Sequence, residues 1–95
     1  MREIIISAVV VVRNEEEHIG ACLDSILSCD LPSSAFEILV IDGMSDDRSR
    51  EIVEERSRKW GNIWLFENQA RITPAGLNTG IRKARGRYIV IMGAH

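Results

Sequence analysis

The stretch that decides the fold is Ile38-Leu39-Val40-Ile41-Asp42-Gly43-Met44-Ser45-Asp46-Asp47. Its first four residues are apolar and mostly β-branched, which is typical of a strand buried in a parallel sheet. An acid, a glycine and polar residues that can begin a helix follow at once. The stretch Val9-Val10-Val11-Val12-Arg13-Asn14-Glu15-Glu16-Glu17 repeats this arrangement upstream. Open α/β sheets bind ligands at the carboxyl ends of such strands, so the two junctions indicate a nucleotide-type crevice.

The composition is that of one globular domain, with 95 residues, 45% of them apolar, and a net charge of −2. No apolar run approaches the ~20 residues of a membrane span. Glu3 interrupts the N-terminus, which therefore does not resemble a secretory signal. We expect a cytoplasmic protein, and a membrane-associated full-length protein remains an alternative.

Residues 69–95 carry five basic residues and no acid. They form either a solvated helix face or a surface that faces phosphate. A nucleic-acid partner is not expected, because aromatic residues are not interleaved with the basic ones. Cys22 and Cys29 are seven residues apart on one expected helix, too far to form a disulfide, so both are expected to be reduced.

Expected strands cover residues 3–12, 36–41, 63–66 and 88–92, with a helix between each pair. The first helix is predicted to start with Asn14 as its cap and Glu17 completing a capping box. The second is predicted to be capped by Ser45 or Asp46 and to run to about Lys59. The third is predicted to begin at Thr73-Pro74 and to end at Gly86, with Leu77, Ile81 and Ala84 facing inward.

This alternation predicts an α/β fold: a three-layer, Rossmann-like, mostly parallel sheet with the order β-α-β-α-β-α-β, in a single domain covering 1–95. The sequence stops directly after a strand, so we expect an incomplete sheet that forms the first part of a larger catalytic domain. An unfinished edge can also pair with another copy, which makes a homo-oligomer one expected state.

Several residues near the strand ends have two interpretations each. Asp42 can accept hydrogen bonds from a nucleobase or a ribose, or it can cap its own turn. Gly76 and Gly80 indicate close approach of a helix backbone to a ligand or to the sheet. Arg71 can bind a pyrophosphate or lie unpaired on the surface, and Asn78 can fix a loop or a ligand.

Five segments resemble the start of a family 2 glycosyltransferase with the GT-A fold. Two of them, Arg71 to Asn78 and Ala84 to Ile89, are more specific and resemble the branch that includes succinoglycan-type exopolysaccharide transferases. The segments are Val9 to Glu16, Leu23-Asp24-Ser25-Ile26-Leu27, Val40 to Asp47, Arg71 to Asn78, and Ala84 to Ile89.

The resemblance implies a site for a nucleotide-diphosphate sugar, most often a UDP-sugar. Asp42 would contact the base, Val11 and Val12 would line its pocket through their backbone, and Arg71 to Asn78 would approach the ribose or diphosphate. The full set of implied binding residues is Val11, Val12, Asn14, Glu15, Asp42, Gly43, Arg71, Gly76, Asn78 and Gly93.

The implied reaction is transfer of the sugar, with inversion, to a saccharide or lipid-linked acceptor in polysaccharide biosynthesis. A divalent cation, Mn²⁺ or Mg²⁺, would offset charge on the leaving diphosphate. The family's Asp-x-Asp metal motif falls at Gly93-Ala94-His95, which leaves His95 as the one candidate metal ligand and makes the cation doubtful. No residue of this chain is assigned as catalytic base, and we predict that the chain alone does not turn over.

Two other α/β classes are disfavoured. A phosphoacceptor receiver domain would place acids after the first and third strands, where Asn14-Glu15 and Glu67-Asn68 stand. A dinucleotide-binding dehydrogenase needs a glycine-rich loop after the first strand, which is absent. The remaining alternative is a non-catalytic α/β module that binds a nucleotide or a partner. The transferase interpretation, as argued from the residues, requires the Asp42 carboxylate to lie within reach of a nucleobase.

Overall fold

The computed structural model describes residues 3–93 and has the expected alternation of strands and helices. The elements are β1 (Ile6–Val12), α1 (Ile19–Leu27), the 3-10 turn η1 (Ser33–Ala35), β2 (Phe36–Asp42), α2 (Ser49–Trp60), β3 (Ile63–Glu67), α3 (Thr73–Lys83) and β4 (Tyr88–Gly93). The four strands form one sheet in the order β3-β2-β1-β4, and all neighbouring pairs are parallel. The predicted parallel α/β architecture is confirmed over these residues.

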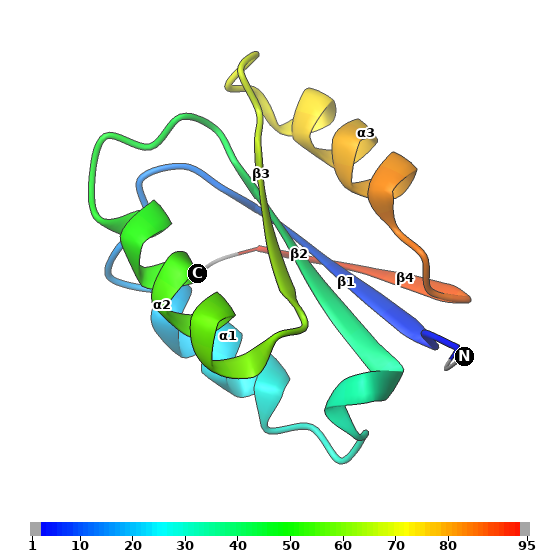
Figure 1. Cartoon of the computed structure of the whole chain (residues 1–95). Helices are drawn as coiled ribbons and strands as arrows, with labels where there is room; N and C mark the ends of the chain where they lie inside the picture. Colours follow the sequence, from blue (N-terminus) through cyan, green and yellow to red (C-terminus); the bar gives the residue numbers. More distant parts are fainter. Residues whose placement is uncertain (1–2, 94–95) are drawn as a thin grey trace.

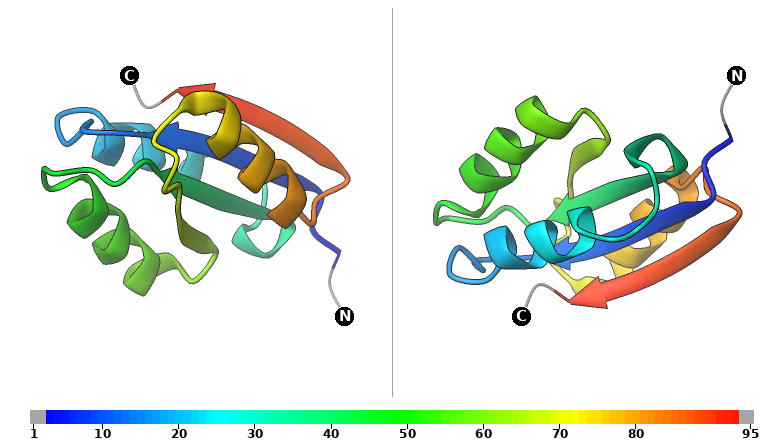
Figure 2. Two further views of the ribbon diagram at one scale, coloured as in Figure 1. Left: turned by 90° about the horizontal axis from the view of Figure 1, so that it is seen from above. Right: turned by 90° about the horizontal axis from the view of Figure 1, so that it is seen from below.

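Helices cover both faces of the sheet, α1 and α2 on one face and α3 on the other (Figure 1, Figure 2). The strand order explains this division. The chain adds β2 and β3 on one side of β1 and then returns to place β4 on the other side. Because parallel crossovers share one handedness, reversing the direction of travel puts the connecting helix on the opposite face. The strand order therefore reverses between β1 and β4, and this boundary is the switch point of the sheet.

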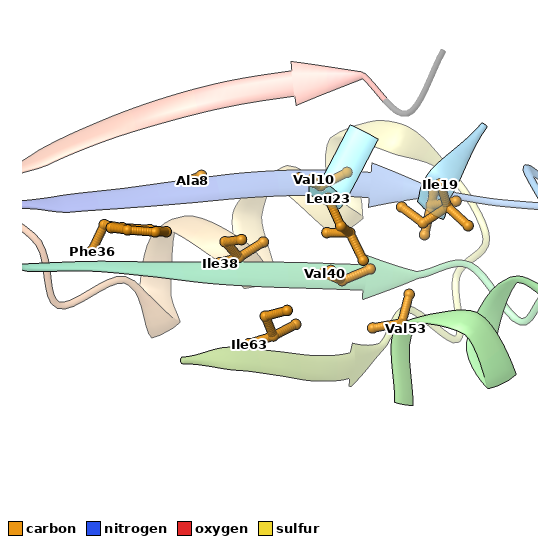
Figure 3. Close-up of a cluster of buried hydrophobic side chains, with 10 residues drawn as sticks. Ala8, Val10, Ile19, Leu23, Phe36, Ile38, Val40, Val53 and Ile63 are labelled. Atoms are coloured by element: carbon orange, nitrogen blue, oxygen red, sulfur yellow. The ribbon is translucent and has the colours of Figure 1, made fainter. Parts of the chain in front are cut away.

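The larger part of the hydrophobic core lies between the sheet and the helices α1 and α2. Side chains alternate along β1, so that Ala8, Val10 and Val12 face this core, where Ile19 and Leu23 of α1 pack on them (Figure 3). A smaller cluster on the α3 face contains Val9, Leu39 and Ile41. Both faces of β1 and β2 are thus covered, which explains why their sequences are continuously apolar.

Helix α3 packs on the sheet through two glycines. Gly76 and Gly80 are buried, and a Cβ on either would meet a side-chain methyl group of β1, from Val11 and Val9 respectively. The two glycines therefore serve close helix–sheet packing, one of the two interpretations of their spacing. The expectation that Ile81 faces inward is wrong, since its side chain is 47% exposed.

The helices start later than the sequence predicts. Helix α1 begins at Ile19 rather than after Asn14, and α2 begins at Ser49 rather than after Ser45 or Asp46. The predicted capping box is wrong because Asn14 has a positive φ of 52° and its side chain bonds to another loop. The end of α3 at Lys83, three residues before Gly86, is a smaller correction.

A buried acid links the first two strands to the start of β4. Glu37 on β2 is 1% exposed and accepts a hydrogen bond from Ser7 on β1 at 2.7 Å. It also accepts bonds from the Arg85 backbone at 2.8 Å and from the Arg85 guanidinium at 3.0 Å and 3.1 Å. This network holds the turn between α3 and β4 against the amino ends of the strands, and sequence reasoning did not find it.

The outer strand β4 is the least buried of the four, with five of its six residues exposed. Both cysteines are free, as predicted from their spacing. Over the described part of the chain, no helix combines the length and the apolar character needed to cross a membrane.

Candidate functional site

The carboxyl ends of the strands meet along one edge of the sheet, as the sequence predicts. Val12 lies opposite Asp42 in the β1–β2 pair, and Val11 lies opposite Gly93 in the β1–β4 pair. The point where the strand order reverses is therefore bordered by the last residues of β1 and β4. Open α/β sheets bind ligands at such a point.

A pocket of about 420 Å³ opens at this edge. Six residues that the resemblance implies as binding residues line it: Val11, Val12, Glu15, Gly43, Arg71 and Gly93. Asn14, Asp42, Gly76 and Asn78 do not line it. Sequence reasoning missed Arg13, Asn68 and Met92, whereas Thr73 and Leu77 lie in the stretch Arg71 to Asn78 that was expected to approach the ribose or diphosphate.

Asp42 is buried in its own loop. Its residue is 0% exposed, and its Oδ2 accepts a hydrogen bond from the Ser45 backbone N–H at 3.0 Å while Oδ1 accepts one from the Ser45 hydroxyl. The Nε of Arg50 lies 3.8 Å from Oδ2 and balances part of the charge. The expectation of an accessible carboxylate is therefore wrong, and the alternative, a cap of its own turn, describes the structure. The argument for a transferase that rested on an accessible Asp42 therefore fails, and Asp42 supports the pocket only indirectly.

The loops after β1 and β2 are joined by side chain–backbone hydrogen bonds. The Asn14 backbone donates to the Ser45 hydroxyl at 2.9 Å, and the Asn14 Oδ1 accepts from the Asp46 backbone at 2.7 Å. Arg13 donates to the carbonyl of Gly43. Asn14 therefore holds the wall of the pocket without lining it.

The side chains of Asp47 and Ser49 also join the loop after β1 to the start of α2. The Glu15 backbone donates to the Ser49 hydroxyl at 2.8 Å, and the Glu16 backbone donates to Asp47 Oδ2 at 3.1 Å. Asp47 Oδ1 accepts from the Ser49 backbone at 2.9 Å and so satisfies the first N–H of α2, a role expected of Ser45 or Asp46. Desolvation acts to raise the pKa of Asp47, but hydrogen bonds from Ser49 and Glu16 outweigh it and hold the pKa below its usual value.

The described residues with positive φ that are not glycine all lie in the loops after β1, β2 and β3. They are Asn14 at 52°, Met44 at 61° and Arg71 at 61°. This conformation is unfavourable for side chains such as those of Met and Arg, and it persists only where surrounding contacts impose it. Such strain often accompanies functional sites, and here it borders the pocket.

Asn68 supplies the contacts that impose the conformation of Arg71. It is 4% exposed, its backbone donates to the Asp42 carbonyl at 2.7 Å, and its Nδ2 donates to the Ile72 carbonyl at 2.8 Å. The Arg71 backbone in turn donates to the Asn68 carbonyl at 3.1 Å. The sequence signal that could have identified Asn68 is its position directly after an expected strand.

The position of the family's metal motif lies at the rim of the pocket. Gly93 has no ligating side chain, and Ala94 and His95 lie outside the described residues, so metal binding by His95 stays a prediction. Between residues 3 and 93, no group of three or more His, Cys, Asp or Glu side chains is placed to hold a metal ion. The residues described here do not fit the implied divalent cation, and we derive no step through one.

The fold and the pocket define a class, namely open parallel α/β domains that bind a ligand at the switch point of the sheet. The family follows from comparison with known proteins. The family model for glycosyl transferase family 2 matches residues 7–95, so the chain belongs to this family.

Relatives and solved structures agree with this membership. A dolichyl N-acetyl-α-D-glucosaminyl phosphate 3-β-D-2,3-diacetamido-2,3-dideoxy-β-D-glucuronosyltransferase of Methanococcus voltae is 35% identical over 92 residues, which are 95% of this chain and 29% of the relative. A poly(ribitol-phosphate) β-glucosyltransferase of Bacillus spizizenii is 33% identical over 89 residues, 92% of this chain and 14% of the relative. The chain therefore spans less than a third of either relative.

Among solved structures, the mannosyltransferase PcManGT of Pyrobaculum calidifontis, in complex with GDP-Man and Mn²⁺, superposes with a TM-score of 0.88 at 28% identity. The match covers 99% of this chain and 28% of that one. Staphylococcus aureus TarS 1–349 gives a TM-score of 0.88 at 25% identity, covering 96% of this chain and 27% of that one. The predicted GT-A type of fold is confirmed.

Proposed function

We propose that this chain is the nucleotide-binding part of an inverting glycosyltransferase and that the pocket at the β1–β4 switch point holds a nucleotide-diphosphate sugar. The observation that carries the proposal is the pocket itself, which joins the ends of β1 and β4 to the strained residue Arg71. Family membership supports the same assignment.

Roles within the pocket follow from chemistry and position. The carboxyl end of β1, with Val11 and Val12, and the adjacent Gly43 offer a largely apolar wall to a nucleobase. Arg71 is exposed at the rim, where its guanidinium can bind a diphosphate through two parallel hydrogen bonds. Asp42, Asn14 and Asn68 act as positioning residues, because each bonds to the loops that form the walls.

In the proposed reaction an acceptor hydroxyl attacks the anomeric carbon of the donor sugar. The bond from that carbon to the diphosphate oxygen breaks, the nucleoside diphosphate leaves, and the acceptor proton passes to a general base. No residue in the described part of this chain is assigned that role. Any divalent cation bound by the protein would rely on His95, because Gly93 offers no ligand.

The proposed donor is a UDP-sugar, and the acceptor is a saccharide or a lipid-linked saccharide in polysaccharide or exopolysaccharide synthesis. The name of the Methanococcus relative, which acts on a dolichyl phosphate sugar, supports a lipid-linked acceptor. Because the Pyrobaculum structure contains GDP-Man, the nucleobase of the donor needs to be tested. A cytoplasmic protein, associated with a membrane through its acceptor or its remaining domains, fits this role.

Isothermal titration calorimetry with UDP, UDP-glucose and GDP, each with Mn²⁺ and with EDTA, tests the proposal. We expect UDP to bind and Arg71→Ala to weaken UDP binding at least about tenfold, because the loss of even one of its two charge-assisted hydrogen bonds has this effect. Arg82→Ala removes the same side chain from an exposed position of α3 away from the pocket and should leave UDP binding unchanged. Absence of binding by all three nucleotides to the folded chain would contradict the proposal.

A second candidate function is nucleotide binding without sugar transfer. The glycine at position 93 favours it, because this position lacks the acid that the family's metal motif would supply. Because the chain alone is not expected to turn over, the test uses a longer protein that contains this chain. UDP binding that is equal with Mn²⁺ and EDTA, together with no release of UDP from UDP-glucose by that protein, would support this alternative.

A further inference from the structure

A second hollow, of about 310 Å³, lies at the opposite end of the sheet from the nucleotide pocket. It is formed where the turn between α2 and β3 approaches the start of β2 and the turn before β4 (Figure 1). The amino and carboxyl ends of a seven-residue strand such as β2 are about 20 Å apart. The hollow is therefore separate from the pocket proposed for the donor.

Both tryptophans of the chain line this hollow. Trp60, the last residue of α2, is 41% exposed, and Trp64 on the edge strand β3 is 45% exposed. Large aromatic side chains are usually more buried than this, so a pair that lines one concavity is informative. The Arg85 guanidinium lies 5.9 Å from the centre of the Trp64 ring and helps to hold its orientation.

A buried acceptor without a partner lies in the wall of the hollow. The Nδ2 of Asn62 donates to the carbonyls of Ser33 at 3.1 Å and Phe36 at 3.2 Å, which fixes the orientation of the amide. Its Oδ1 is buried and accepts no hydrogen bond from the described residues. The oxygen itself has almost no exposed surface, so Asn62 contributes a polar wall to the hollow rather than a direct contact for a ligand.

The hollow carries no net charge. Its charged lining residues, Glu37 and Arg85, are bonded to each other at 3.0 Å and 3.1 Å. Phosphate and carboxylate ligands need an uncompensated cation, which this pair does not offer. Two half-exposed tryptophan rings and a neutral polar wall match a ligand that has C–H faces and many hydroxyl groups.

We infer that this hollow is a second saccharide-binding site, which takes a neutral stretch of a polysaccharide chain rather than the sugar being transferred. The choice of a saccharide over other neutral ligands rests on the proposed function, in which the acceptor is a saccharide. A chain held at this hollow would raise the local concentration of acceptor near the protein without taking part in the reaction.

Tryptophan fluorescence distinguishes this site from the nucleotide pocket, because the nucleotide pocket contains no tryptophan. The probes are cellohexaose and chitohexaose, two neutral β-linked hexamers with flat sugar faces, titrated into the full 95-residue chain. We expect at least one hexamer to shift the emission in a saturable way, and glucose or N-acetylglucosamine at equal sugar concentration to give a weaker response.

Variants separate this site from other aromatic surfaces. Trp64→Ala should weaken hexamer binding, measured by calorimetry, at least about fivefold, as expected for loss of an aromatic anchor. Trp64→Tyr keeps a ring and should retain most of the affinity. Tyr88→Ala is the matched control, since Tyr88 is an aromatic residue of the exposed strand β4, 63% exposed and outside the hollow. Circular dichroism checks that each variant is folded.

Two results would overturn the inference: no response of the folded chain to either hexamer, or equal hexamer affinity for Trp64→Ala and the unmodified chain. UDP binding is measured on the same samples and should be unchanged in Trp64→Ala. In the unmodified chain, absence of UDP binding alone counts against the proposed function, and absence of hexamer binding alone counts against this second site.

Discussion

The Ser45 hydroxyl donates a hydrogen bond to the buried carboxylate of Asp42 and at the same time accepts one from the Asn14 backbone at 2.9 Å. One side chain therefore ties the end of β2 to the loop after β1. Gly43, which lines the nucleotide pocket, lies between Asp42 and Ser45 in the sequence. The shape of the pocket depends on this link, although neither Asp42 nor Ser45 lines it.

Ser45→Ala should lower both stability and nucleotide affinity. The substitution leaves Asp42 with one fewer donor and the Asn14 N–H without its partner, at a cost of about 1–3 kcal/mol. The loosened loops should weaken UDP binding, measured by calorimetry, while urea unfolding gives the stability change.

Asp42→Asn distinguishes positioning by Asp42 from direct contact with the base. The amide keeps an oxygen for the Ser45 hydroxyl but loses the acceptor of the Ser45 N–H, so a positioning role predicts similar, partial losses for both variants. Full UDP affinity in Ser45→Ala combined with complete loss in a folded Asp42→Asn would instead indicate that the carboxylate reaches the base.

Gly80→Ala should destabilise the protein although alanine favours helices. The gain in helix propensity is about 1 kcal/mol, whereas the new methyl group would collide with Val9, which is fully buried on β1. Overpacking of this kind costs about 1–3 kcal/mol, so we expect a net loss measured by urea unfolding.

Two further variants serve as a control and a rescue for Gly80→Ala. Gly20→Ala in α1 would meet the end of the flexible Arg56 side chain, 3.0 Å from Nη2, and should be close to neutral. In Gly80→Ala/Val9→Ala the smaller β1 side chain makes room for the methyl group, so the double variant should lose less than the sum of the single losses. Strict additivity would show that the two residues do not contact each other as described.

The order of elements was predictable because each carries its own local pattern. The β1 and β2 sequences are continuously apolar, and Thr73-Pro74 begins α3 as predicted. The starts of α1 and α2 were not predictable in this way. Asn14 and Ser45 have the side chains of helix caps, but each bonds across to the neighbouring loop, a partner about 30 residues away in the sequence.

The site was predictable to the extent that it depends on strand ends. Parallel strands place their carboxyl ends at one edge, and six of the ten expected binding residues line the pocket there. The accessibility of Asp42 depended on whether Ser45 would bond to it, which residue types alone do not decide. Glu37 was missed because a single acid within a strand sequence gives no sign of its partners Ser7 and Arg85.

Asp47 should make the protein less stable in acid. Its pKa is lowered in the folded state, by hydrogen bonds from Ser49 and Glu16 that outweigh desolvation, so the unfolded chain binds the proton more readily. The stabilisation is complete above the ordinary pKa of 3.8 and is lost as the pH falls through the lower, folded value.

Urea unfolding between pH 6 and pH 2.5, a range that includes the ordinary carboxyl pKa, measures this effect. In Asp47→Asn the dependence of stability on pH below 4 should be shallower. Asp30→Asn is the control, since Asp30 is an exposed acid in the loop after α1. If the free energy of unfolding falls equally with pH below 4 in Asp47→Asn and in the unmodified protein, the hydrogen bonds from Ser49 and Glu16 do not stabilise this carboxylate.

Gly93→Asp should create a dependence of nucleotide binding on Mn²⁺. Gly93 lies at the rim of the pocket, opposite Val11, and a Cβ added there meets no atom within 4 Å. The resemblance places the first acid of the family's metal motif at this position, and a carboxylate is a preferred ligand for Mn²⁺. We expect UDP affinity in Gly93→Asp to be higher with Mn²⁺ than with EDTA by about fivefold or more, consistent with roughly 1 kcal/mol from one added anionic ligand.

Gly93→Asn matches the size without the charge and should show a smaller difference. Equal affinities with Mn²⁺ and EDTA in a folded Gly93→Asp protein would mean that the end of β4 does not direct a ligand toward the diphosphate.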